Sequence, residues 1–184
     1  MLLVSCFIFS QSIAKLKTET QKIYDAYYTM DFETVTQLSY PKMVTQFGKE
    51  KWVEKLDFDY QNDETRMRLQ LVSPVFTFGT VQQIEGIATS IVSYKNPIRY
   101  FFEKKLNATS ADQKAKMLQE INLTKDVTFE PKLNSFNVRR HSKLIAIIDE
   151  STSGEWRFFN WDDPKQRELF ETIFGVALKK QLGL

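Results

Sequence analysis

Residues 18–58 carry helical repeats of apolar side chains that are interrupted at two helix-breaking steps. The first repeat predicts a helix over about residues 18–29, and Asp31 suits the N-cap of a short second helix. Pro41 should end that second helix, because proline lacks an amide hydrogen and restricts the residue before it. Gly48 then precedes a third amphipathic helix. The apolar residues of these repeats are Leu16, Ile23, Tyr27, Met30, Phe32, Val35, Leu38, Phe47, Trp52 and Leu56.

From residue 66 the apolar period changes to two, which is typical of half-buried strands. Residues 143–149 are apolar at nearly every position, so they predict a strand in the centre of a sheet. A hairpin loop over residues 150–154 connects it to a return strand. The predicted strands are residues 66–71, 75–81, 87–94 with a continuation over 98–102, 127–129, 143–149 and 156–161, with a loop at 131–135.

Two further helices are expected in the second half of the chain. Residues 111–121 carry an amphipathic stripe, and a broad apolar face follows Pro164, with Asp162 or Asp163 as the cap. Gly79, Gly86 and Pro97 are suited to bulges or edges that let strands curl. The predicted fold class is therefore α+β, with N-terminal helices packed in a strongly curved antiparallel sheet, an inserted helix and an extra C-terminal helix.

This order of elements resembles the nuclear transport factor 2-like fold, the cone shared with ketosteroid isomerases and placed with cystatin-like folds. The residues that carry the resemblance are 23–38 and 48–52, which match the helix, acidic turn, helix and Gly-led third helix of that family. Residues 142–148 with 154–158 are similar to the last hairpin of uncharacterised exported Bacteroidetes proteins. The resemblance implies a curved sheet wrapped around a helix, with a cavity that the C-terminal helix would cap.

The composition indicates one globular domain, here assigned to residues 15–184. The chain has 184 residues, of which 42% are hydrophobic and 26% charged. The formal net charge of +2 is spread along the chain, so nucleic acid is not expected as a partner. The aromatic share of 14%, with 15 Phe, predicts large rings that fill a core or line a cavity.

The first 14 residues carry no charge and end in small residues before Lys15, which resembles a secretory signal. Export to the periplasm or outside the cell is therefore expected. A lipid anchor is the alternative, because residues 3–6 resemble the lipobox of bacterial lipoproteins and would place the lipid on Cys6. A buried first element is a further alternative, since the segment is too short to span a membrane. Cys6 is the single cysteine, so no internal disulfide forms.

No residue pattern points to a specific reaction, metal or cofactor. One His and one Cys cannot supply a nitrogen and sulfur ligand set. In isomerase-like members of the resembled family an acid or base and a Tyr project into the cone, which implies Tyr27 or Tyr28 as acid and Asp57 or Asp59 as base. The lone histidine, His141, is a weaker candidate base beside Arg139 and Arg140. Core packing, turn capping and surface exposure are the competing interpretations of these residues.

Three functions are compatible with the sequence. The first is non-enzymatic binding of a small apolar ligand or a protein partner. The second is an isomerase or dehydratase-like enzyme. The third is a structural or dimerising module, which would form a homodimer. Arg139, Arg140 and Lys143 form a basic trio sized for one carboxylate or phosphate. The residues expected to contact an apolar ligand are Tyr24, Tyr27, Trp52, Phe76, Phe78, Trp156 and Phe158.

Overall fold

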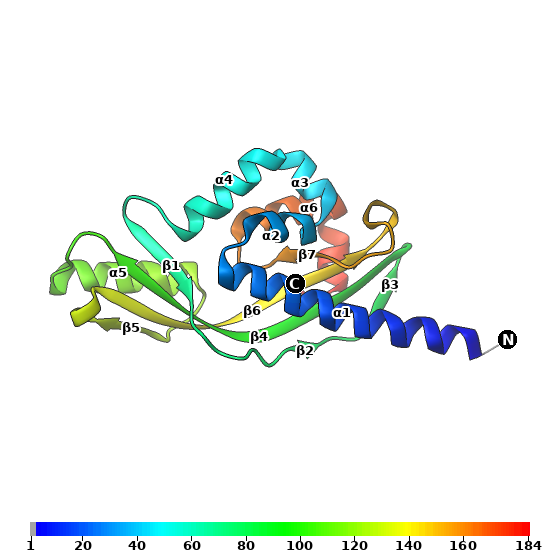
Figure 1. Cartoon of the computed structure of the whole chain (residues 1–184), viewed down its shortest axis with the longest axis horizontal. Coiled ribbons are helices and arrows are strands. Elements are labelled where there is room, and N and C mark those ends of the chain that lie inside the picture. The colour runs from blue at the N-terminus through cyan, green and yellow to red at the C-terminus, as the bar shows by residue number, and fades with distance from the viewer. Residues whose placement is uncertain (1–2) are drawn as a thin grey trace.

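The structure is a computed structural model that describes the backbone of residues 3–184 and the side chains of residues 13–184. It begins with helices α1 (Leu3–Thr29), α2 (Phe32–Leu38), α3 (Pro41–Phe47) and α4 (Lys49–Tyr60). Two more helices follow between and after the strands, α5 (Ala108–Ile121) and α6 (Pro164–Gln181). The fold is therefore mixed α+β, with the helices gathered around one twisted sheet (Figure 1).

The sheet in the described part is antiparallel, has seven strands and does not close on itself. Its centre is the pair β4 (Ile87–Phe102) and β6 (Ser135–Ile148), which run side by side over most of their length. On the other side of β4 lie β1 (Thr65–Leu69), β2 (Thr77–Phe78) and β3 (Gln82–Ile84). On the other side of β6 lie β5 (Val127–Glu130) and β7 (Arg157–Asn160), one after the other.

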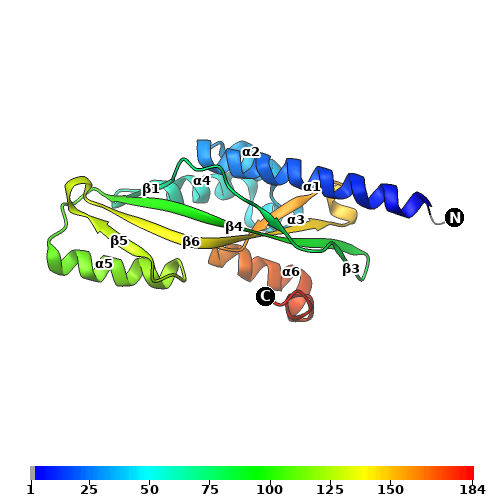
Figure 2. The same ribbon diagram turned by 90° about the horizontal axis from the view of Figure 1, so that it is seen from below.

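The two faces of the sheet are covered differently. Even-numbered residues of β4 and β6 share the inner face, where Tyr94 packs edge-on against Tyr24 of α1 and Lys114 of α5 lies over Phe102. Odd-numbered residues form the outer face, where α6 covers only the end that contains β7 (Figure 2). None of the described helices covers the outer face in the middle of β4, where Lys95 is exposed opposite His141. A hollow bounded by helices can therefore form only on the inner face or at an edge.

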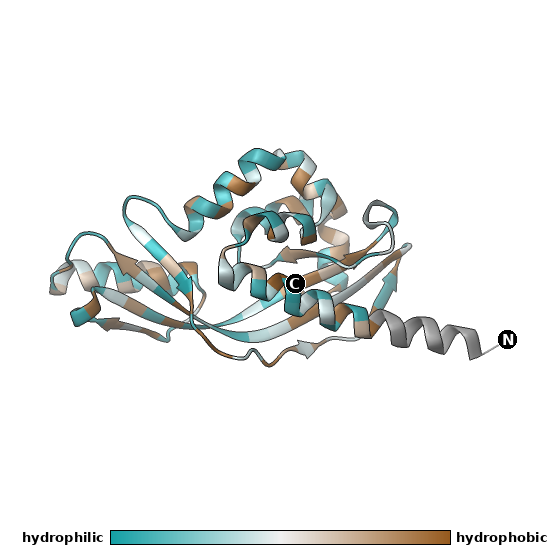
Figure 3. Cartoon of the chain, in the orientation of Figure 1, coloured by the Kyte–Doolittle hydropathy of each residue, from teal (hydrophilic) through white to brown (hydrophobic). Residues whose placement is uncertain are grey.

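An aromatic cluster attaches α3 and α6 to the β7 edge. The ring of Phe159 stacks on Tyr40 at 5.1 Å between centroids and meets Phe170 edge-on at 5.2 Å. The backbone amide of Tyr40 donates to the carbonyl of Phe158, so the segment before α3 covers part of the β7 edge. The hydropathy colouring shows hydrophobic residues along β6 and β7 and alternating hydropathy along α4 (Figure 3). The predicted C-terminal helix is present, is capped by Asp163 and bends at Gly175.

The second helix ends before Pro41, as predicted, because α2 stops at Leu38. The helix α3 was not predicted: Pro41 occupies its first position, where the missing amide hydrogen costs nothing. Asp31 caps α2, as predicted, and accepts from the Thr34 amide. The predicted break at Pro97 was wrong, because β4 runs through it. The position tolerates proline since neither β1 nor β2 pairs with residue 97.

Other strand boundaries differ from the predicted ones. Residues 75–81 contain only the two-residue strand β2, because the chain there follows β4 loosely and is largely exposed. The predicted loop at 131–135 is a short 3-10 turn, Pro131–Leu133, and β6 already begins at Ser135. His141 therefore lies within the long strand rather than ahead of it. The charged residues 139 and 140 conceal the first half of that strand from a simple hydrophobic pattern.

The N-terminal prediction is left open by the structure. The backbone of α1 runs without interruption from Leu3 into the core-packed residues Leu16 and Ile23. The side chains of residues 1–12, including Cys6, lie outside the described residues, so the signal segment and the lipid anchor stay predictions. Among the helices that the structure describes, none combines the length and the apolarity needed to cross a bilayer.

Candidate functional site

A hollow of about 330 Å³ lies on the inner face of the sheet, between α4, α5 and the start of α6. Its aromatic lining consists of Tyr27, Phe58, Tyr60, Tyr100 and Phe102, and its charged lining of Lys55, Asp59, Arg140, Asp162 and Asp163. A larger groove on the outer face is lined by the loop around Val72 and Val75 together with exposed strand residues. We take the inner hollow as the candidate site, because it combines aromatic rings with desolvated charges, as ligand sites commonly do.

Arg140 and Asp162 form the most buried ion pair at this hollow. The guanidinium of Arg140 lies 3.2 Å from the Asp162 carboxylate, and their side chains are 12% and 15% exposed. Arg140 also donates to the Asn122 side-chain oxygen at 2.9 Å, and the Tyr100 hydroxyl reaches the same oxygen at 3.3 Å. Burial alone would lower the pKa of Arg140, but Asp162 together with the nearby tyrosines outweighs it and raises that pKa. Arg140 is therefore a fixed positive charge on the inner face.

This ion pair retains unused hydrogen-bonding capacity. In the part of the chain that the structure describes, the Nε of Arg140 and the Oδ2 of Asp162 have no well-directed hydrogen bond. A buried donor or acceptor without a partner is costly, so such groups usually meet water or a ligand. The Asp162 Oδ2 still lies 3.2 Å from the Arg140 guanidinium, so the Nε of Arg140 is the one donor of the pair without a polar contact among the described residues.

Lys55 connects α4 to the start of α6 at the mouth of the hollow. Its ammonium group contacts Asp59 at 2.5 Å and Asp163 at 2.7 Å. Burial raises the pKa of the Asp59 carboxyl above its ordinary value, despite the opposing effect of Lys55. Asp163 also caps α6 by accepting from the backbone amide of Lys165. The charged rim is thus built into the helix ends that frame the hollow.

Tyrosine hydroxyls supply the neutral polar groups of the site. The rings of Tyr27 and Tyr60 stack with centroids 6.3 Å apart, and burial raises the pKa of both phenols. Gln166 and Asn160 interact with the Tyr27 hydroxyl and oppose part of that rise in its pKa. The Tyr60 hydroxyl has no hydrogen-bond partner among the described residues, although the residue is only 6% exposed. These phenols stay protonated at neutral pH and can donate to a ligand.

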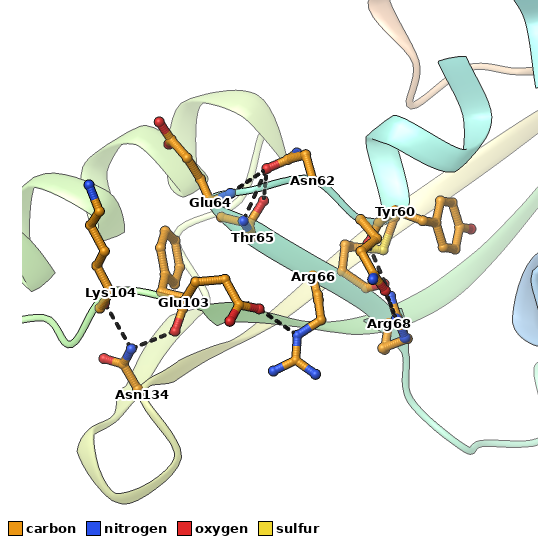
Figure 4. A network of polar contacts seen from close by, with 12 residues as sticks. Tyr60, Asn62, Glu64, Thr65, Arg66, Arg68, Glu103, Lys104 and Asn134 are labelled. Carbon is orange, nitrogen blue, oxygen red and sulfur yellow. Dashed lines mark hydrogen bonds and ion pairs between the residues drawn. The ribbon is translucent and has the colours of Figure 1, made fainter. Parts of the chain in front are cut away.

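A polar network fixes the end of α4 and with it Tyr60 (Figure 4). The guanidinium of Arg68 on β1 donates to the carbonyls of Tyr60 at 3.0 Å and Met67 at 2.8 Å. Asn62 accepts from the amides of Glu64 and Thr65, which sets the turn from α4 into β1. One wall of the hollow is therefore held by main-chain contacts rather than by packing alone.

The structure separates the predicted catalytic candidates. Tyr27 and Asp59 line the same hollow. Tyr28 is 37% exposed, and Asp57 lines a separate depression with Gln61, outside the hollow. His141 is exposed at the sheet edge. The structure thus brings together one predicted acid–base pair of the several considered.

Most of the predicted ligand-contacting aromatics lie elsewhere. Trp52, Trp156 and Phe158 are at most 1% exposed in the core and line no hollow described above. Tyr24 packs edge-on against Phe76 and Tyr94 under β2, with Phe78 beside Phe76. Of that set, Tyr27 alone is on the lining of the inner hollow.

Sequence reasoning missed Tyr60 and Tyr100; it assigned Arg140 to a basic trio and Asp162 to a possible helix cap, not to this hollow. Tyr60 continues the helical spacing of Trp52 and Leu56 by four residues, so extending the third helix would have found it. Arg140 alternates with Val138 and Ser142, which predicts its inward direction once the strand is known to be continuous. Its pairing with Asp162 depends on tertiary structure and has no local signal.

Comparisons with known proteins leave the chain without an assigned family. No family model matches it, and no similar curated protein or solved structure was found. Among the described residues, no group of three or more His, Cys, Asp or Glu side chains is arranged to hold a metal ion. The function must therefore be argued from the site itself.

Proposed function

We propose that this chain is a non-catalytic binding domain whose ligand is a small, largely apolar molecule held in the inner hollow. The observation that carries the proposal is the set of five aromatic rings around a hollow of about 330 Å³. Rings of Tyr and Phe provide apolar contact at low conformational cost, and phenol groups can orient the one polar group of such a ligand.

The polar groups of the lining support a ligand that is not purely hydrocarbon. The Nε of Arg140 and the Tyr60 hydroxyl have no hydrogen-bond partner among the described residues. A hydroxyl or carboxamide oxygen of the ligand can accept from such a donor. A ligand without such a group would leave these donors unpaired, at a cost in affinity.

The fold and location complete the proposal. We infer that the curved sheet and the helices α1 and α4 form a cone of the nuclear transport factor 2-like kind, with the hollow as its interior. The charge-free opening residues support export, and an exported binding domain would meet its ligand outside the cytoplasm.

The binding is tested with N-phenyl-1-naphthylamine, a neutral apolar dye whose fluorescence rises in an apolar site. Wild-type protein should bind it saturably. Ile121→Trp should weaken binding at least about five-fold, because residue 121 lines the hollow and is 52% exposed, so a larger ring can be accommodated without disturbing the core.

Leu71→Trp is the matched control, since Leu71 is 83% exposed and lines no hollow described above. It should leave dye affinity within about two-fold of wild type. Absence of saturable binding, or equal weakening by both variants, contradicts the proposal.

An isomerase-type activity is the second candidate, favoured by Tyr27 and the desolvated Asp59 on one hollow. In that case Asp59 abstracts a proton next to a carbonyl and Tyr27 donates to the carbonyl oxygen. The contact between Asp59 and Lys55 argues against this activity, since an ion-paired carboxylate is a weaker base. Deuterium incorporation into cyclohexanone in D₂O tests it: Asp59→Asn should abolish the exchange and Asp57→Asn should not. Equal exchange rates for wild type and Asp59→Asn reject this activity.

A further inference from the structure

The outer row of strands beside β6 is interrupted. β5 pairs with β6 only up to Val138, and β7 begins to pair at Leu144. Residues 139–143 of β6 therefore have no strand on this side. The interruption lies between the end of α5 and the start of α6, next to the inner hollow but open to the outside.

The backbone of His141 faces this interruption. The Arg139 amide donates to the Asp126 carbonyl, and the Lys143 carbonyl accepts from the Trp161 amide, so odd-numbered residues direct their backbone groups to this edge. Backbone groups of an antiparallel strand alternate between its two sides, which gives His141 the same direction. Its amide thus has no strand opposite to accept from it.

A notch of about 180 Å³ occupies the interruption. Its lining includes Arg140, His141 and Lys143 of β6, Trp161 and Asp162 of the turn after β7, and Arg167 of α6. Arg140, Lys143 and Arg167 bring three positive charges, against the one negative charge of Asp162. The carboxylate of Asp162 is already committed to Arg140 at 3.2 Å.

The two outer cations of the notch are not neutralised. Within residues 13–184, neither Lys143 nor Arg167 has a carboxylate at ion-pair distance, whereas the neighbouring Arg139 pairs with Asp126. The basic trio predicted from the sequence does not stay together. Arg139 is absent from the lining of the notch, and the third cation there is Arg167, 24 positions after Lys143.

We propose that this notch binds a phosphate group, free or as the monoester of a small molecule. Two unpaired cations match the charge of a phosphate dianion, and an arginine fork suits its oxygens. The amide of His141, which has no described strand opposite it, adds a neutral donor from the strand edge. The site is distinct from the proposed apolar-ligand hollow, although Arg140 and Asp162 form a wall of both.

Calorimetric titration at constant ionic strength and pH 7.5 tests the proposal with inorganic phosphate, glycerol 3-phosphate and acetate. Wild-type protein should bind at least one phosphate compound saturably and acetate at least about ten-fold more weakly. The tighter phosphate compound shows whether the group is free or esterified. Lys143→Gln and Arg167→Gln should each weaken binding about ten-fold, because each removes one direct charge.

Arg139→Gln is the matched control, since it removes the same charge from the same strand outside the notch. It should change the affinity less than about two-fold. Phosphate should also shift the backbone amide resonance of His141 in an NMR titration. No saturable phosphate binding, acetate binding of equal strength, or equal losses in all three variants overturns the proposal. Dye binding in the inner hollow is measured separately, so failure here leaves the proposed function standing.

Discussion

The guanidinium of Arg140 and the carboxylate of Asp162 meet at 3.2 Å on the boundary between the inner hollow and the notch at the sheet edge. Arg140 comes from the middle of β6, and Asp162 from the turn between β7 and α6. This contact is possible because no strand covers β6 between β5 and β7. The interruption that leaves this edge of β6 uncovered is also where the Arg140–Asp162 pair separates the inner hollow from the notch.

Removing one partner of this pair should destabilise the fold. Asp162→Asn should lower the free energy of unfolding by about 3 kcal/mol, because it leaves Arg140 buried without its counter-charge. Urea unfolding followed by circular dichroism measures the change. Asp126→Asn, at the largely exposed pair with Arg139, should cost less than about 1 kcal/mol. Equal losses of unfolding free energy in the two variants would show that the buried pair stabilises the fold no more than the exposed pair does.

The hydrogen bond from Tyr40 to Asp149 should make stability depend on pH. Burial would raise the pKa of Asp149, but hydrogen bonds from Tyr40 and Ser151 outweigh it and hold that pKa below its ordinary value. A lowered folded-state pKa adds stability above the unfolded pKa, and this stability is lost as the pH falls through the folded value.

Tyr40→Phe should therefore lower the free energy of unfolding by about 1.5 kcal/mol at pH 7, and by less at a pH where Asp149 is protonated. Denaturant unfolding at several pH values measures this difference. Tyr28→Phe, at an exposed phenol, is the control and should be close to neutral at every pH. A Tyr40→Phe effect that stays constant with pH would assign the loss to packing instead.

The aromatic cluster at β7 should account for much of the attachment of α6. Phe170 is fully buried and contacts Phe159, Trp161 and Phe174. Phe170→Ala should cost about 3 kcal/mol, since truncation leaves a cavity that the cluster cannot fill. Val176→Ala, on the same helix but 52% exposed, should cost below about 1 kcal/mol in the same thermal or urea unfolding experiment. A loss below 1 kcal/mol for Phe170→Ala would show that α6 is held by other contacts.

Short sequence patterns correctly predicted the helix caps and the apolar strand at the centre of the sheet. Asp31 and Asp163 cap their helices as expected, and residues 144–147 form the buried centre of the sheet. The long strand β6 was predicted too short, because Arg140 is turned inward to a partner that comes from the turn before α6. The break before Pro41 is real, but the helix α3 that starts at Pro41 was not predicted, because a proline that starts a helix looks the same in sequence as one that only ends the previous helix.

The site was predicted less completely than the fold. Tyr27 and Asp59 were identified from the family resemblance, and both line the hollow. Trp52 and Trp156 were grouped with Tyr27 as ligand contacts because of their residue type, yet they are fully buried in the core. Ring content does not distinguish core packing from cavity lining, because both need large apolar side chains. That distinction comes from the tertiary packing of α4 and α5.

Ligand binding should depend on the contacts that hold Tyr60. Arg68→Gln removes the guanidinium that donates to the Tyr60 carbonyl, so the end of α4 should become more mobile and dye affinity should fall about three-fold. Arg66→Gln alters a neighbouring exposed pair with Glu103 and should leave dye affinity unchanged (Figure 4). Fluorescence titration compares the two variants. Equal affinities would show that Tyr60 needs no support from β1.

The central claim is that a small apolar molecule occupies the hollow beside Tyr27, Tyr60 and Tyr100. Crystals of the protein soaked with iodobenzene test it directly, because the anomalous signal of iodine reports the position of the bound molecule. The account predicts an iodine peak inside the hollow, in contact with those three rings. A hollow without iodine, with peaks confined to the outer groove near Val72 and Val75, would contradict it.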